Sequence, residues 1–446
     1  MKMRKISITL LSLLVSVGVM AEGYQINLSS SKQLGMGHIG ASMKLGAESM
    51  IFNPAGLAFM TSTNEVTLGG NAIFSKVSYK NGSTTAESDN PVSPPIYGYY
   101  GRKLGENLAV GVSINNPAGN GLYWGDTWAG ASLVQHISLK AFSVQPTISY
   151  KFWDKLSIGA GLTINFGEFE LAKALIPAGG LAGLASAVPS LAPIINYYAA
   201  KPAASLVLSG KSEYSYGFNV GILYDVTDQI TVGASYRSKV DLSVAEGEAD
   251  VNYPGPVMRN VIQTAATAMP STFKPIIWLE NASFSASLPI PANLNVGVTY
   301  KPTDYFTLAA EVNYTQWSVY EKLDIVFDNE LLGTSTLTKN FKNSFTYRLG
   351  TEIAASEKLQ VRFGVIYDMT PVDLTKYSPE TPGANKLSLT AGLTYAPCEK
   401  IEYNLGFQYL NGAHTSGSVP VSPTATFSGT YKTIAYIPSF GVSFKF

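Results

Sequence analysis

The chain has 446 residues and a formal net charge of zero, and charged residues make up 14% of it, against about 25% in an average soluble domain. Aromatic residues reach 11%, which excludes a disordered chain, and there is no basic excess of the kind that nucleic-acid-binding proteins carry. Because cysteine occurs once, a disulfide scaffold is excluded as well, and much of the surface is expected to face something other than water.

Residues 1–21 have the pattern of a secretory signal peptide. Lys2, Arg4 and Lys5 precede an uncharged apolar run over 6–19, and compact residues follow up to Ala21. An N-terminal membrane anchor is the alternative, but the run is shorter than the ~20 apolar residues that a spanning helix needs. We therefore predict cleavage after Ala21.

Residues 22–62 do not have a strand pattern, because Gly35, Gly37, Gly40 and Gly46 interrupt the segment, and the first strand is expected near Glu65. The large barrel inferred below would leave a lumen that something must fill. We interpret 22–62 as a plug within that lumen. A free periplasmic tail is the alternative, but the glycine, alanine and methionine content suits close packing better than solvation.

Segments of strict apolar and polar alternation recur through 63–446; clear examples are 156–166, 230–237, 306–315, 359–368 and 401–409. Alternation over about ten residues is typical of a strand that crosses a bilayer at a tilt. Short turns also alternate with long connections, which are 80–94, 117–137, 171–210, 244–285, 327–336, 370–385 and 411–430. A soluble β-sandwich alternates too, but it does not explain this spacing. We predict an all-β fold, a transmembrane antiparallel β-barrel of about 14 strands in the outer membrane of a Gram-negative bacterium.

Two of the long connections, 171–210 and 244–285, are apolar. Proline and glycine interrupt the uncharged stretch 174–200, which predicts a surface loop with short apolar helices rather than a membrane helix. Exposed apolar loops are costly unless they pack against each other or bind a ligand, and both interpretations stay open.

The last strand ends with Phe440, Val442, Phe444 and Phe446 on one face. A terminal aromatic residue is a common insertion signal for such barrels, so we expect Phe446 to be read by the barrel-assembly machinery. Phe446 is also the last residue expected to face lipid.

An ordered set of short motifs runs along the whole chain that follows the signal peptide. It includes Gly23-Tyr24-Gln25-Ile26, Asn53-Pro54-Ala55-Gly56-Leu57, Asn116-Pro117-Ala118-Gly119, Thr315-Gln316-Trp317-Ser318 and Thr370-Pro371-Val372. Together these motifs resemble the FadL-type family (OmpP1/FadL/TodX), outer-membrane transporters of long-chain fatty acids and other hydrophobic compounds. One segment departs from the family pattern: Thr381-Pro382-Gly383-Ala384-Asn385 stands where the family usually has a Pro-Asp pair.

The resemblance implies capture of a hydrophobic ligand by two apolar loops, transfer to a pocket inside the barrel, movement of an N-terminal hatch and lateral exit. The capture residues would be Leu184, Leu191, Ile194, Ile195, Val261, Ile277 and Trp278. Asn53, Pro54 and Ala55 match the hatch motif, and Asn115, Asn116 and Pro117 mark the lateral gate at the end of the third strand.

A carboxylate headgroup would need a cation inside the lumen. The candidates are Arg237, Lys239, Lys339 and Lys342, each of which also fits the description of an ordinary lumen or loop charge.

Three alternatives accompany this hypothesis. One is uptake of aromatic hydrocarbons by the same family, and a second is a general porin, which the plug and the apolar loops disfavour. The third is an outer-membrane barrel enzyme, disfavoured because His38, His136 and His414 fall in separate regions and no Gly-x-Ser-x-Gly motif occurs. We expect no cofactor, no metal and no nucleic acid. The expected partners are the hydrophobic ligand, outer-membrane lipid and lipopolysaccharide, with the chain as a monomer.

Overall fold

A computed structural model describes residues 23–422 and 424–446, so the predicted signal peptide lies outside the described residues. Strands dominate this part of the chain, and they form one continuous antiparallel sheet. Its helices are all short. Among the described residues, no helix has the length and apolar character that crossing a bilayer would require.

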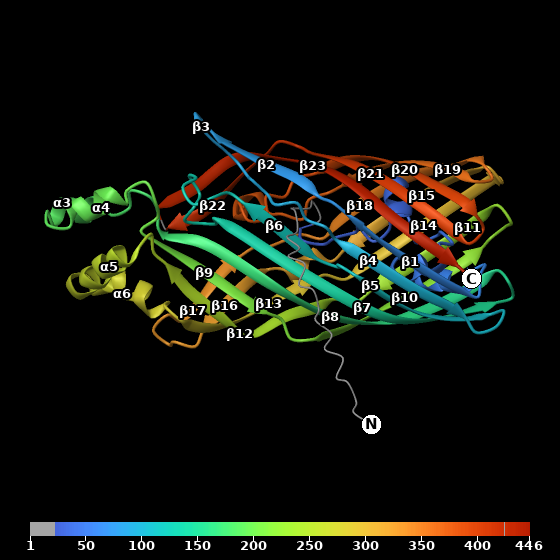
Figure 1. The fold of residues 1–446 in the computed structure, drawn as a ribbon, viewed down its shortest axis with the longest axis horizontal. Coiled ribbons are helices and arrows are strands. Elements are labelled where there is room, and N and C mark those ends of the chain that lie inside the picture. The colour runs from blue at the N-terminus through green and yellow to red at the C-terminus, as the bar shows by residue number, and fades with distance from the viewer. Residues whose placement is uncertain (1–22, 423) are drawn as a thin grey trace, which may run out of the picture.

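Fourteen strands of the described chain, each hydrogen-bonded to two neighbours, close into a barrel through the pairing of the first with the last (Figure 1). They are β1 (Asn64–Asn71), β4 (Ile96–Lys103), β5 (Leu108–Asn115), β7 (His136–Phe152), β8 (Leu156–Ile176), β10 (Ser215–Asp225), β11 (Ile230–Arg237), β14 (Asn293–Thr303), β15 (Phe306–Thr315), β18 (Ser344–Ser356), β19 (Leu359–Asp368), β20 (Lys386–Cys398), β21 (Ile401–Gly412) and β23 (Ala425–Lys445). The predicted fold class and strand number are confirmed.

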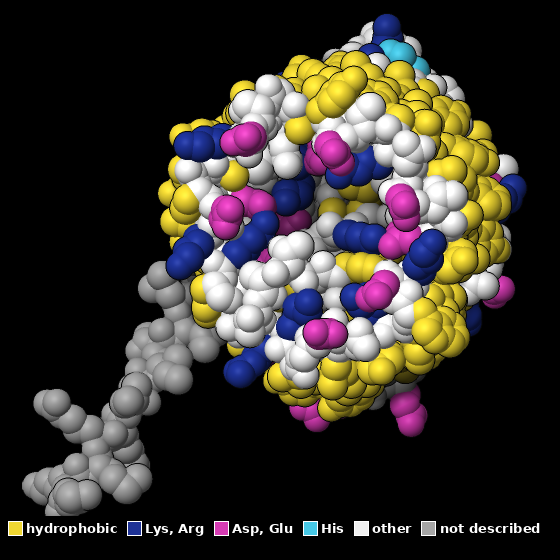
Figure 2. All heavy atoms as spheres, turned by 90° about the vertical axis from the view of Figure 1, so that its right-hand side faces the viewer, with side chains coloured by type: hydrophobic (Ala, Val, Ile, Leu, Met, Phe, Trp, Pro, Cys, Tyr) yellow, Lys and Arg dark blue, Asp and Glu magenta, His cyan; other side chains and the backbone are white. Residues whose placement is uncertain are grey.

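The alternation in the sequence sorts side chains between the outside and the lumen. In β19, Phe363, Val365 and Tyr367 are exposed, whereas Arg362, Gly364 and Ile366, which alternate with them, are buried. An end-on view shows hydrophobic side chains around the rim and charged side chains gathered inside it (Figure 2). This distribution matches a barrel whose outer face meets lipid.

One end of the barrel, called here the long-loop end, extends well beyond the fourteen-strand ring. The chain continues to pair above the closed ring, so that parts of the predicted long connections are strands. The strands beyond the ring are β2 (Phe74–Asn81), β3 (Thr84–Glu87), β6 (Gly119–Tyr123), β9 (Ala204–Lys211), β12 (Val240–Asn252), β13 (Ala282–Ile290), β16 (Lys322–Phe327), β17 (Thr334–Thr338) and β22 (Thr415–Ser422). The C-terminus lies at the opposite, short-turn end (Figure 1).

Four short helices protrude from the long-loop end in Figure 1, and they form what we call the helical head. They are α3 (Ala182–Ala187), α4 (Ala192–Tyr197), α5 (Pro256–Ala268) and α6 (Pro270–Trp278). Short helices in 174–200 were expected from the sequence, and this expectation is confirmed by α3 and α4.

Residues 23–60 fold into short turns inside the barrel: α1 (Ser31–Gly35), η1 (Gly46–Glu48), α2 (Ser49–Phe52) and η2 (Pro54–Phe59). Polar bonds attach them to the wall. The Glu311 carboxylate accepts hydrogen bonds from Gly40 N at 2.9 Å and Ala41 N at 2.7 Å, and Arg348 pairs with the same carboxylate at 2.6 Å. A carboxylate that accepts two backbone N–H groups and one guanidinium group is a strong anchor for a segment without its own core.

The wall around this segment carries directly opposed glycines on twelve strands, which we call the glycine collar. The pairs are Gly69 with Gly441, Gly101 with Gly111, Gly159 with Gly221, Gly233 with Gly297, Gly350 with Gly364, and Gly392 with Gly406. At most of these positions an added Cβ would meet the N-terminal segment: at Gly233 it would lie 1.9 Å from Ala41 O, and at Gly392 it would lie 2.8 Å from Gly35 Cα. The collar therefore allows backbone to approach backbone.

We predict that Gly233→Ala lowers the free energy of unfolding by about 1–3 kcal/mol, because the new methyl group would overlap the Ala41 carbonyl. Urea-induced unfolding of the purified protein in detergent measures this change. Gly183→Ala is the matched control, because Gly183 lies in α3 with nothing within 4 Å of the added carbon. Equal stability of the two variants would contradict close packing at the collar.

Candidate functional site

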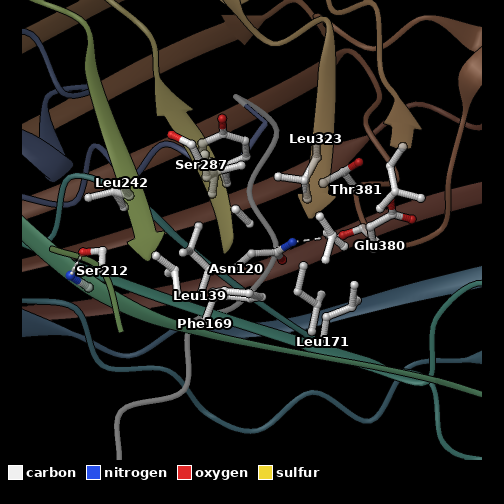
Figure 3. Close-up of a pocket in the computed structure, with 18 of the residues that line it drawn as sticks. Asn120, Leu139, Phe169, Leu171, Ser212, Leu242, Ser287, Leu323, Glu380 and Thr381 are labelled. Atoms are coloured by element: carbon white, nitrogen blue, oxygen red, sulfur yellow. Dashed lines mark hydrogen bonds between the residues drawn. The ribbon is translucent and has the colours of Figure 1, made fainter. Parts of the chain in front are cut away.

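An apolar pocket lies inside the barrel towards the long-loop end, and we call it the inner pocket (Figure 3). The space that no atom fills is about 860 Å³. Its wall comes from the inward faces of β7, β8, β12, β13, β16 and β17, and its apolar side chains include Leu139, Phe169, Leu171, Leu242, Leu288, Leu323, Ile325 and Leu337. This space includes open solvent, and each CH₂ that a ligand buried among these side chains would gain about 0.8 kcal/mol.

Tyr24 forms the floor of the inner pocket. Its ring packs edge-on against Trp317 at 4.9 Å and Tyr320 at 5.5 Å between centroids, and its hydroxyl donates to the Pro289 carbonyl. The preceding Gly23 has φ +64°, and a Cβ there would lie 2.4 Å from the Trp317 ring. The sequence Gly-Tyr at this point is thus required for the tyrosine to reach its position.

A polar chamber lies between the N-terminal segment and the wall beyond Tyr24. Its lining includes His38, Asn219, Asn293, Asn295, Asn313, Arg237, Glu311 and Arg348. Arg237 Nη2 donates to Ile51 O at 2.7 Å, and Glu311 holds Arg348. A hydrocarbon chain that entered this chamber would displace the hydration of these groups without replacing their hydrogen bonds.

A wider vestibule of about 1410 Å³ opens at the long-loop end and is bordered by Leu133, Leu175, Leu206, Leu279 and Phe327 among others. It shares Lys339 and Glu380 with the inner pocket. Lys339 Nζ pairs with the Glu380 carboxylate and donates to Ser378 Oγ at 2.7 Å. Burial raises the pKa of Glu380, but the attraction of Lys339 together with the hydrogen bonds from Lys339 and Ser378 outweighs this effect and holds the pKa below its ordinary value.

The predicted gate region is an interruption in the wall. Strand β5 ends at Asn115 and the chain resumes as β6 at Gly119, since Pro117 has no N–H to donate. The Asn116 side chain fills part of the ladder: its Oδ1 accepts from Ile96 N at 3.0 Å and its Nδ2 donates to Ala141 O at 2.9 Å.

The N-terminal segment completes this interrupted ladder. Ile26 N donates to Pro117 O at 3.1 Å, Gly119 N donates to Tyr24 O at 2.8 Å, and Gln25 bridges to Ala118. Residues Tyr24, Gln25 and Ile26 therefore connect the floor of the inner pocket to the interrupted part of the wall.

The predicted hatch motif is fixed to both the plug and the wall. Asn53 is fully buried, and its Nδ2 donates to Ala41 O at 2.6 Å and to Ile222 O at 3.0 Å. Its Oδ1 accepts from Ala55 N at 3.1 Å, which caps η2, and Pro54 occupies the first position of that helix. Ala55 O accepts hydrogen bonds from Ser149 and Ser157 of the wall.

The helical head places the predicted capture residues in two environments. Leu184, Ile195 and Val261 are buried in a shared core of the two loops, and Leu191, Ile194 and Ile277 are partly buried against it. Trp278 is half-buried at the end of α6. Mutual packing of the loops, one of the two interpretations left open, therefore accounts for most of these side chains, while Tyr197 is 81% exposed beside them.

The four candidate carboxylate partners lie apart from one another. Lys339 lines the inner pocket and Arg237 the polar chamber. Lys239 is exposed and pairs with Asp241 at 3.0 Å, and Lys342 is exposed. The structure thus brings one of the four, Lys339, to the inner pocket.

Several site residues escaped the sequence reasoning. Tyr24 stood in a quoted motif without an assigned role, and Glu380 lies one residue before the segment that departs from the family pattern. Asn120 and Trp124 hold that loop, through Asn120 Nδ2 to Glu380 O at 2.9 Å and Trp124 Nε1 to Pro379 O at 3.1 Å. The departure of 381–385 from the family pattern is the sequence signal that points to this loop.

Comparisons with known proteins agree with this geometry. The family described as outer membrane protein transport protein (OMPP1/FadL/TodX) matches residues 12–446. A long-chain fatty acid transport protein of Escherichia coli O6:H1 is 23% identical over 415 residues, covering 90% of this chain and 89% of that protein.

Two solved structures have the same fold. A FadL homologue of Pseudomonas aeruginosa superposes with a TM-score of 0.80 at 18% identity, covering 95% of this chain and 100% of that one. The toluene transporter TodX of P. putida has a TM-score of 0.68 at 18% identity, covering 96% and 99%.

We predict that Asn53→Asp loosens the N-terminal segment, because a carboxylate accepts but cannot donate to the carbonyls of Ala41 and Ile222. Two unpaired buried carbonyl groups cost about 1–3 kcal/mol each. Hydrogen exchange read by mass spectrometry should show faster exchange in 41–59 and unchanged exchange in β18 to β21. Asn107→Asp, in an exposed turn, is the control. Unchanged exchange in 41–59 would contradict the anchoring role of Asn53.

Proposed function

Because the chain belongs to the OMPP1/FadL/TodX family of outer membrane transport proteins, we propose that it takes up long-chain fatty acids or similar hydrophobic compounds across the outer membrane of a Gram-negative bacterium. The observation that carries this proposal is the inner pocket, a partly open space inside the barrel that is lined mainly by apolar side chains. An apolar cavity stays dry and favours apolar ligands, whereas a channel for polar solutes needs a hydrated path.

The ligand enters from the long-loop end in this proposal. Along this path the ligand would meet apolar surface first on the helical head, at the exposed Tyr197, and then in the vestibule, at Leu175 and Leu279. A chain that moved from there to the inner pocket would exchange one apolar contact surface for another, and it would not need to cross water.

The exit route is lateral. A straight path would lead through the polar chamber, where Arg237, Glu311 and Arg348 make desolvation costly for a hydrocarbon. The interruption between Asn115 and Gly119 lies beside the pocket floor, and its backbone partners are Tyr24 and Ile26. Displacement of these residues would free the floor and the wall together.

Residues 22–62 act as the hatch in this proposal, with Asn53, Pro54 and Ala55 as its anchor. Its attachment to the wall through hydrogen bonds and the smooth glycine collar supports a segment that can shift without unfolding the barrel.

The apolar pocket and the structural likeness to a toluene transporter favour aromatic hydrocarbons as a second ligand class. The family consists of transport proteins, which disfavours the barrel enzyme as a function. We also propose that the chain is a monomer whose apolar belt contacts lipid and lipopolysaccharide, and that Phe446, 62% exposed at the end of the last strand, is read during insertion.

We predict that a disulfide between Gln25→Cys and Ala118→Cys blocks uptake, because it would lock the N-terminal segment onto the wall. Residues opposed in an antiparallel bridge have Cα atoms about 4.5–5.5 Å apart, which suits a disulfide. The background carries Cys398→Ser, since Cys398 is exposed. Uptake of radiolabelled palmitate and hexadecanol by cells should fall under oxidation and recover with reductant.

The matched control for this cross-link joins Ser416→Cys to Thr430→Cys, whose hydroxyls lie 2.7 Å apart on the paired strands β22 and β23 and do not line the inner pocket. Full uptake by the oxidised Gln25–Ala118 variant would rule out a gate at this place.

We predict that deletion of residues 22–62 raises single-channel conductance in planar bilayers. The segment fills space in the lumen, and water would take its place beside wall residues such as Glu311 and Gly233. Conductance equal to that of the full chain would mean that the segment does not occlude the lumen.

A further inference from the structure

Among the described residues that line the inner pocket, one side chain is cationic, and it is already paired with a carboxylate of the protein. Of the described residues that line the pocket, Glu168, Lys339 and Glu380 are charged. Lys339 is 3% exposed and is bonded to Glu380 and Ser378, and Ser378 Oγ also donates to Glu380 at 2.6 Å. Glu168 is paired with Lys140 at 3.0 Å. Every charge that faces the pocket is thus compensated within the protein.

Glu380 is held in place from both sides. Asn120 Nδ2 donates to its carbonyl at 2.9 Å, as Figure 3 shows, and Trp124 Nε1 donates to the neighbouring Pro379 carbonyl at 3.1 Å. Tyr377 N donates to Ser418 O at 3.0 Å on the other side of the loop. The carboxylate is therefore a fixed part of the wall and not a mobile loop charge.

Cations in the vestibule do not replace Lys339. Lys173 and Lys376 line the vestibule but not the inner pocket. A carboxylated ligand could meet them on entry, but further in it would find no unpaired cation, because Lys339 is already paired with Glu380. In an apolar pocket the ligand would therefore lose the hydration of its own charge without gaining a partner for it.

We propose that Glu380 is a specificity-determining residue that makes the inner pocket selective for uncharged hydrophobic ligands, such as long-chain alcohols and hydrocarbons, over their carboxylates. This inference rests on the proposed function and names its substrate class. Glu380 lies directly before the segment 381–385, which departs from the pattern usual in the family.

Binding of dodecanol and dodecanoate to the purified protein in detergent tests the proposal, measured by tryptophan fluorescence or calorimetry at about pH 8, where a carboxylic acid is ionised. The wild-type chain should bind dodecanol about tenfold or more tightly than dodecanoate. Equal affinities, or a preference for dodecanoate, would overturn the selectivity and leave the proposed function intact. Absence of binding by either ligand would instead contradict the proposed function.

Variants identify the residue responsible. Glu380→Gln frees the charge of Lys339, so dodecanoate affinity should rise about tenfold while dodecanol affinity changes little. Glu87→Gln removes the same charge from an exposed pair with Lys76, away from the inner pocket and the vestibule, and should leave both affinities unchanged.

The double variant Glu380→Gln with Lys339→Met should not gain dodecanoate affinity, because the released cation is absent. A gain equal to that of Glu380→Gln alone would overturn the assignment to the pair. The wild-type ratio of affinities decides the selectivity even if a variant does not fold.

Discussion

Inside a bilayer, every backbone N–H and C=O group must find its partner within the protein, and this requirement shapes the whole molecule. It closes β1 onto β23 and leaves a wide lumen. At Pro117 the requirement cannot be met by the strand itself, and the Asn116 side chain and the backbone of Tyr24 to Ile26 supply the missing partners. The N-terminal segment therefore supplies backbone partners where the strand is interrupted.

The N-terminal segment fills the lumen by close approach rather than by interlocking side chains. The glycine collar offers a smooth surface, so the segment is held by a small number of directed bonds, including those of Glu311, Asn53 and Arg237. Each such bond contributes about 1–3 kcal/mol or less. This balance is compatible with the shift of the segment that we propose.

The lumen contains two compartments whose lining side chains differ in polarity. The inner pocket is lined mainly by apolar side chains, and the charged side chains of the described residues that line it are paired within the protein, whereas the polar chamber beyond Tyr24 is lined by charges and amides. A hydrocarbon would be more stable in the first than in the second. In the proposed function this difference favours the lateral exit over a path through the polar chamber.

The sequence by itself determined the barrel, because an alternation of period two is a local property: 359–368 shows the faces of β19 without knowledge of any neighbour. It also indicated the plug, the hatch motif at Asn53 and the interruption at Pro117, which are single segments. The glycine collar could not be found in this way, because the pairing of Gly69 with Gly441 can be seen only in the register of the closed sheet. Likewise Leu184 and Val261 suggested capture, but the two loops bury them against each other. Tertiary structure alone decided that Lys339 meets Glu380 and not a ligand, because the charge that faces a pocket depends on partners brought together from distant parts of the chain.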